Sequence, residues 1–141
     1  MTRRRQAILL AYLTLSLFPY DFFISSAEFS QKLASDRYAL LVAPVACESL
    51  PICVGKLAAE TIAVIPLGLL LSMVRGKAAR RPYATAAWCG LALGFVIEAV
   101  QLFLASGVSQ GMSLLTRAAG MTLGVALHRH ARAQWLLALQ A

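Results

Sequence analysis

The sequence predicts an all-α integral membrane protein, a four-helix bundle with both termini in the cytoplasm. Hydrophobic residues make up 60% of its 141 residues and charged residues only 13%, which is less charge than the surface of a soluble domain requires. The apolar residues also come in long blocks, each close to the roughly 20 residues that span a bilayer. We therefore expect one transmembrane domain over residues 1–141, with the lipid bilayer as a partner.

Basic residues predict the direction in which each block crosses the membrane. The net charge is +7, and the basic residues outside the apolar blocks gather mainly at 3–5, 75–81 and 129–132. Because short cytoplasmic segments are enriched in Lys and Arg, all three groups are expected on the cytoplasmic side. These groups lack the motif spacing and the neighbouring aromatic residues of a nucleic-acid-binding surface, so no nucleic-acid partner is expected.

The predicted spans follow one another in alternating directions. The first covers residues 6–24, runs outward and is retained, since the bulky residues of "PYDFFI" stand where signal cleavage requires small ones. The second, over 55–74, runs inward, and the basic stretch "RGKAARRP" leads from it to the third. Pro82 suits the start of that third span, over 83–104, and the fourth returns inward over 112–128.

A single long loop is predicted on the outer side, between the first and second spans. Its stretch "YALLVAPVA" is too short to cross a membrane and contains Pro44, so it lies at the interface, re-enters the membrane or packs on a partner subunit. Cys47 and Cys53 bracket "ESLPI" in the same loop. An oxidising exterior permits a disulfide between them, and the alternative is two unpaired thiols near the interface.

Ionisable and strongly polar residues of the spans gather in the outer half of the predicted bundle. They are Asp21, Lys56, Glu60, Glu98, Gln101 and Arg117. A charge at the centre of a membrane costs about 2.5–3.5 kcal/mol on an insertion scale, so these side chains are expected to face the bundle interior. Lys56 and Glu60 share one helix face, as do Glu98 and Gln101. We expect interhelical pairs such as Glu60 with Arg117, or Lys56 with Glu98.

Two interpretations of this polar cluster stay open at the level of sequence. Either it is a set of buried salt bridges that fixes helix register, or it is an outward-facing cleft that receives a ligand headgroup. No Cys or His spacing fits a metal site, no cofactor is indicated, and no nucleophile stands beside a base, so no enzymatic activity is expected. The spacings of Gly90 with Gly94 and of Gly120 with Gly124 predict close packing within the bundle, with homodimerisation as the alternative.

Four motifs resemble those of the VanZ-like family, named for a protein associated with teicoplanin resistance. They are "LFPYDFF" at the end of the first span, "ETIAVIPLGLLLS" in the second, "EAVQLF" in the third and "RAAGMTLG" in the fourth. The resemblance covers nearly the whole chain in the right order. Lys56 and Glu60 stand where the family usually has Asp and Asn, and Gly107, Ser113 and Arg117 stand where its last motif usually has Arg, Asp and Asn.

The resemblance implies a small multi-pass protein of the bacterial inner (cytoplasmic) membrane with a binding or accessory role at the cell envelope. Its ligand would be a glycopeptide antibiotic or a lipid-linked precursor, held in a cleft lined by Asp21, Glu98, Gln101 and Arg117. The alternative is a non-catalytic structural subunit of a larger membrane complex, in which the substituted motif positions serve as packing charges. A stable membrane-protein partner would then take the place of the ligand.

Overall fold

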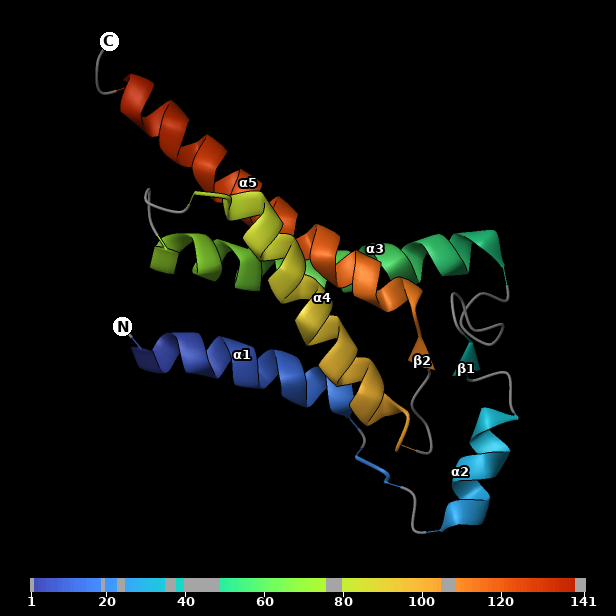
Figure 1. The fold of residues 1–141 in the computed structure, drawn as a ribbon. Helices are drawn as coiled ribbons and strands as arrows, with labels where there is room; N and C mark the ends of the chain where they lie inside the picture. Colours follow the sequence, from blue (N-terminus) through green and yellow to red (C-terminus); the bar gives the residue numbers. More distant parts are fainter. Residues whose placement is uncertain are drawn as a thin grey trace.

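The computed structural model describes residues 2–18, 20–22, 25–34, 38–39, 49–75, 80–104 and 109–138. Helices dominate this part of the chain: α1 (Thr2–Leu17), α2 (Ser26–Leu33), α3 (Leu50–Arg75), α4 (Pro82–Gln101) and α5 (Met112–Ala138) (Figure 1). Two strands of two residues each, β1 (Tyr38–Ala39) and β2 (Ser109–Gln110), form a parallel pair. The predicted all-helical class is therefore confirmed for the described residues.

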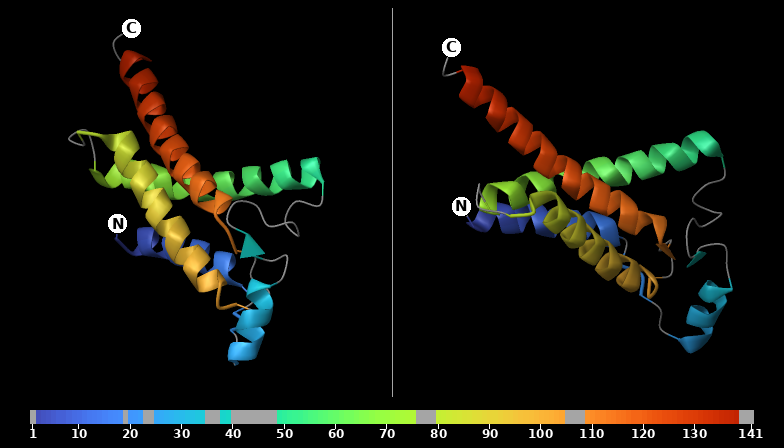
Figure 2. Two further views of the ribbon diagram at one scale, coloured as in Figure 1. Left: turned by 45° about the vertical axis from the view of Figure 1, so that its right-hand side comes forward. Right: turned by 45° about the horizontal axis from the view of Figure 1, so that its top comes forward.

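Helix α5 lies against both α3 and α4 and forms the most extensive helix contacts of the chain, while α1 contacts α3 and α4 less extensively. We call α1, α3, α4 and α5 the helical body. Four helix ends lie together on the side of the molecule away from α2 (Figures 1 and 2). They are the start of α1, the end of α3, the start of α4 and the end of α5. The opposite side, which we call the α2 end, holds the other four helix ends.

Glycines allow α5 to approach its two neighbours closely. A Cβ atom added at Gly90 would lie 2.6 Å from the Arg117 carbonyl oxygen of α5. On the other side of α5, a Cβ atom at Gly120 or Gly124 would collide with a carbonyl oxygen of α3. The predicted small-residue packing within the chain is thus confirmed, since these contacts bring helix backbones together.

Helix α1 ends at Leu17, although the first span was predicted to continue to residue 24. Tyr20 adopts a left-handed backbone conformation, with φ 65°, and its hydroxyl donates a hydrogen bond of 2.8 Å to the carbonyl oxygen of Thr14. The sequence reason is Pro19, because a proline has no N–H to donate and disfavours a helical residue before it. Beyond this turn, Phe22 forms an antiparallel bridge with Leu104 beside the end of α4.

The remaining helices differ from the predicted spans at their ends. Helix α3 begins at Leu50, α4 ends at Gln101, and α5 continues to Ala138. Two segments are long and apolar enough to cross a membrane, Leu50–Val74 and Pro82–Gln101, and a shorter apolar segment covers Gln6–Leu17. Within the described residues, α5 is not apolar enough to count as a third membrane-crossing segment. Its buried arginine and its polar second half lower its mean hydropathy.

The predicted outer loop contains the short helix α2. Ser25 and Glu28 form a reciprocal capping box at its start: the Glu28 N–H donates to Ser25 Oγ (3.3 Å), and the Ser25 N–H donates to Glu28 Oε2 (3.1 Å). The Phe29 ring stacks on Phe103 after α4, with centroids 5.6 Å apart.

Further along the same loop, β1 pairs with β2, with Tyr38 opposite Ser109. Cys53 is disulfide-bonded, whereas Cys47 and most of the stretch predicted as interfacial lie outside the described residues. Cys89 of α4 is a free, half-buried cysteine.

Candidate functional site

A buried ion pair joins α4 to α5 inside the helical body. Arg117 Nη1 donates to Glu98 Oε1 at 3.0 Å, and the two residues are only 4% and 7% exposed. Glu98 Oε2 accepts a second hydrogen bond of 2.7 Å from the backbone N–H of Gln110, just before α5 begins. Both carboxylate oxygens are therefore engaged, and the pair meets the requirement that a buried charge be matched and hydrogen-bonded.

Helix α1 reaches the same arginine. Arg117 Nε donates a hydrogen bond of 3.1 Å to the hydroxyl oxygen of Tyr12. The neighbouring contact between α1 and α4 is also polar, because Gln101 Nε2 donates to the carbonyl oxygen of Ser16 at 3.0 Å. Polar side chains of α4 and α5 thus hold α1 against these two helices.

Glu60 of α3 is bound by hydroxyl groups of α5. Its Oε2 atom accepts hydrogen bonds of 3.0 Å from Ser113 Oγ and from Thr116 Oγ1. Gln110 Nε2 donates to Ser113 Oγ at 3.3 Å, which connects Glu60 to the segment that contacts Glu98. We call the connected set Tyr12, Glu60, Glu98, Gln110, Ser113, Thr116 and Arg117 the polar network.

Both predicted ion pairs are wrong. Arg117 binds Glu98 instead of Glu60, and within the described chain Lys56 forms no ion pair with Glu98. The reason is the arrangement around α5. Its Gly120 and Gly124 side faces α3, whereas Arg117 lies over Gly90 and Gly94 of α4. Because Glu60 approaches from the α3 side, it meets the hydroxyl groups that precede Arg117 instead of its guanidinium.

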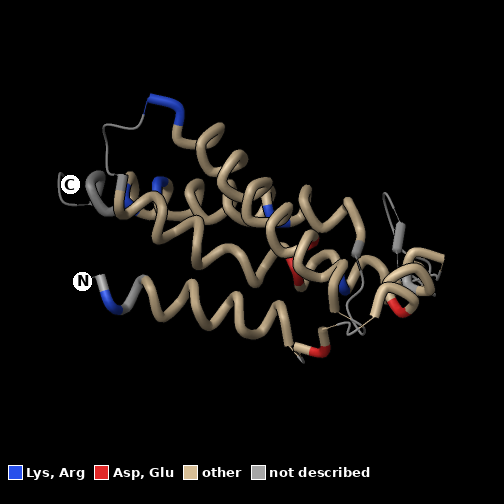
Figure 3. The backbone as a smooth tube through the Cα atoms, turned by 60° about the horizontal axis from the view of Figure 1, so that its bottom comes forward, with Lys and Arg blue, Asp and Glu red and all other residues tan. Residues whose placement is uncertain are grey.

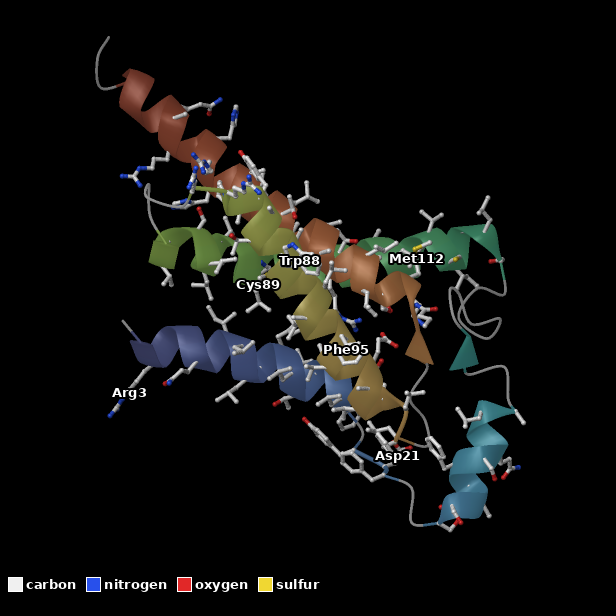
Figure 4. The ribbon with its side chains drawn as sticks, in the orientation of Figure 1. Arg3, Asp21, Trp88, Cys89, Phe95 and Met112 are labelled. Carbon is white, nitrogen blue, oxygen red and sulfur yellow. The ribbon has the colours of Figure 1, made fainter. Side chains whose placement is uncertain are left out.

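The structure therefore brings together three of the six predicted site residues, Glu60, Glu98 and Arg117, in one network. Gln101 lies one helical turn beyond Glu98 and contacts α1. Figure 4 shows Asp21 beyond the end of α1, next to the end of α4. Lys56 is half-buried one turn before Glu60, and within the described chain it makes no ion pair.

Several members of the polar network were not predicted as site residues: Tyr12, Gln110, Ser113 and Thr116. A signal for two of them exists in the sequence. Ser113 stands three residues before Thr116 and four before Arg117, so its side chain is a neighbour of both on the helix surface. Gln110 gives no such signal, because its contact with Glu98 uses the backbone N–H.

The polar network is a closed, hydrogen-bonded cluster in which Arg117 pairs with Glu98, while the carboxylate of Glu60 accepts hydrogen bonds from hydroxyl groups. Among the described residues, every buried side-chain nitrogen and oxygen atom has a hydrogen-bond partner. The same part of the chain contains no group of three or more His, Cys, Asp or Glu side chains that could hold a metal ion. The network therefore acts first by fixing α1, α3, α4 and α5 relative to one another.

Charge is distributed unequally along the helical body (Figure 3). Most of the described Lys and Arg residues lie at the end where α1 and α4 begin, which we call the basic end, whereas Lys56 and Arg117 lie nearer the other end of α3 and α5. The described Asp and Glu residues lie in the half toward α2.

Comparisons with protein-family models, with curated proteins and with solved structures find no match for this chain.

Proposed function

We propose that the chain is a multi-pass protein of the bacterial inner membrane, of VanZ-like type, in which α1, α3, α4 and α5 form a four-helix bundle with both termini cytoplasmic. Large apolar side chains on the outside of the helices support this placement. Leu15, Ile62, Trp88 and Phe95 are each at least 63% exposed, and exposed apolar surface of this extent is typical of contact with lipid or with a partner.

The separation of charge supports the proposed orientation. The basic end, where α1 and α4 begin, would face the cytoplasm, in agreement with the enrichment of Lys and Arg on that side. The α2 end and the polar network would then lie toward the outside.

The orientation is tested by labelling single cysteines with a membrane-impermeant maleimide in spheroplasts. We expect Ser30→Cys, on the exposed surface of α2, to react without permeabilisation. Arg80→Cys, exposed just before α4, should react only after the membrane is opened. Both variants are made in a background in which all three native cysteines are replaced by alanine. Labelling of Arg80→Cys in intact spheroplasts would reverse the proposed orientation.

For the role of the protein, we propose non-enzymatic binding of an anionic cell-envelope ligand at the outer side of the polar network. This proposal rests on the observation that Lys56 is half-buried and has no ion-pair partner in the described chain. It precedes Glu60 by one helical turn and so lies toward the outer surface. A carboxylate or phosphate of a glycopeptide or lipid-linked molecule would neutralise this cation, whereas the cation of the network, Arg117, is already paired with Glu98.

The alternative function, a structural subunit of a larger membrane complex, is favoured by a different observation. All buried polar side-chain atoms in the described residues are already hydrogen-bonded, as expected for charges that fix helix packing. Trp88 and Phe95, which are 72% and 66% exposed on α4, would then contact a partner helix instead of lipid.

The two roles are separated by purifying the tagged chain from its native membrane in mild detergent and identifying accompanying proteins by mass spectrometry. The binding role predicts recovery of the chain without a stoichiometric partner. It also predicts that Lys56→Gln weakens retention of an anionic envelope ligand, while Arg3→Gln at the opposite end does not. A stoichiometric partner that is lost in Trp88→Ala or Phe95→Ala would establish the subunit role instead.

A further inference from the structure

A pocket of about 520 Å³ lies at the basic end, between the first turn of α4 and the second half of α5. Its lining residues are Tyr83, Leu123, Ala126, Leu127, Arg129 and His130. The volume lies within the range of about 300–1,000 Å³ that is usual for small-molecule sites. It is separate from the polar network, whose residues Glu98 and Arg117 lie toward the opposite ends of α4 and α5.

The pocket combines an apolar wall with a cationic rim. Leu123 and Leu127 are 48% and 52% exposed and stand one helical turn apart on α5. At the rim, the guanidinium carbon of Arg129 lies 5.8 Å from the centre of the Tyr83 ring. This distance permits a cation–π interaction, so Tyr83 holds the guanidinium next to the pocket.

The positive charge of this rim is not neutralised by the described protein. Within the described residues Arg129 forms no ion pair. Residues 112–138 of α5 contain no Asp or Glu, and the acidic residue of α4, Glu98, is bound to Arg117 in the other half of the molecule. Arg80 and Arg81 directly precede the helix that carries Tyr83 and add further positive charge. The pocket therefore matches an occupant that carries a negative group next to a hydrocarbon segment.

We propose that this pocket binds an anionic phospholipid of the cytoplasmic leaflet, with its phosphate at Arg129 and an acyl chain against Leu123 and Leu127. The inference rests on the proposed membrane placement, which puts the basic end at the level of the inner headgroups. Basic pockets between helices on the cytoplasmic side of a membrane are suited to anionic headgroups. The occupant is a lipid and not a free phosphate, because half of the lining is apolar.

The test is native mass spectrometry of the detergent-purified chain in an equimolar mixture of phosphatidylglycerol and phosphatidylcholine with identical acyl chains. We expect the phosphatidylglycerol adduct to dominate for the natural chain. In Arg129→Gln its apparent affinity should fall about fivefold, the factor that corresponds to one basic residue at an anionic surface. The matched control is Arg3→Gln, which removes the same charge from the start of α1, away from the pocket (Figure 4).

The outcomes separate the lipid site from the membrane proposal. Equal adducts of the two lipids, or an equal loss in Arg129→Gln and Arg3→Gln, would overturn the lipid site and leave the membrane placement standing. Extraction of the natural chain from membranes by alkaline carbonate would overturn the placement and the lipid site together. Because Arg129 is exposed, both variants should keep the melting temperature of the natural chain in lipid-free detergent, so that a change in binding is not a change in folding.

Discussion

The variant Glu98→Gln is expected to lose about 3–5 kcal/mol of stability, the cost of leaving one member of a buried ion pair without its partner. Glutamine has nearly the same size and its amide oxygen can still accept the N–H of Gln110, so the change isolates the charge. Arg117 would then lie 4% exposed without a counter-charge. The loss is measured as a fall in melting temperature by size-exclusion chromatography of heated, detergent-purified protein.

Two further variants make this result specific. Glu28→Gln carries the same chemical change at an exposed capping position where glutamine is also accepted, so its effect should stay within about 0.5 kcal/mol. The double variant Glu98→Gln with Arg117→Gln should be more stable than Glu98→Gln alone, because no unmatched charge remains. If Glu98→Gln and Glu28→Gln shifted the melting temperature equally, the ion pair would contribute nothing to stability.

The second large effect is expected from Gly124→Ala, with a loss of about 1–3 kcal/mol through overpacking. A Cβ atom at this position collides with the carbonyl oxygen of Ile65 and would lie 2.8 Å from the Cα atom of Gly68. Both neighbours are backbone atoms, which cannot rotate away as a side chain can, so α3 and α5 must move apart. The same thermal measurement in detergent records the loss.

Gly55→Ala is the matched control for this packing effect. It places the same methyl group within α3, where no heavy atom lies within 4 Å. Because alanine suits a helix better than glycine, we expect a gain of about 0.5–1 kcal/mol in place of a loss. Equal destabilisation by both substitutions would show that the α3–α5 contact tolerates a methyl group.

The sequence allowed the helical class and half of the charged site to be predicted, for a clear physical reason. Glu60, Glu98 and Arg117 stand out because each interrupts an otherwise apolar stretch, where an unmatched charge is costly. Their pairing could not be predicted in the same way. It depends on the direction in which each side chain leaves α5, which is set by the close contacts of Gly90 with α5 and of Gly120 with α3.

Other features were missed because they carry weak signals in a linear sequence. The hydroxyl groups of Tyr12 and Thr116 do not stand out within apolar helices, yet each provides a hydrogen bond to a charged side chain. The end of α1 was placed too late, because the apolar residues continue after Pro19 although the helix does not. Here the backbone restriction imposed by proline outweighs hydrophobic continuity.

The early end of α1 has a consequence for the surrounding bilayer in the proposed placement. At 1.5 Å per residue, the apolar segment Gln6–Leu17 of α1 reaches at most about 18 Å, whereas the 25 residues of Leu50–Val74 in α3 reach about 38 Å. A hydrocarbon core is about 30 Å thick, so one side of the protein is too short for it and the other too long. Such hydrophobic mismatch is relieved by local thinning beside α1 and by tilting of α3. The protein should therefore thin the bilayer on one side only and favour regions of membrane that are already thin.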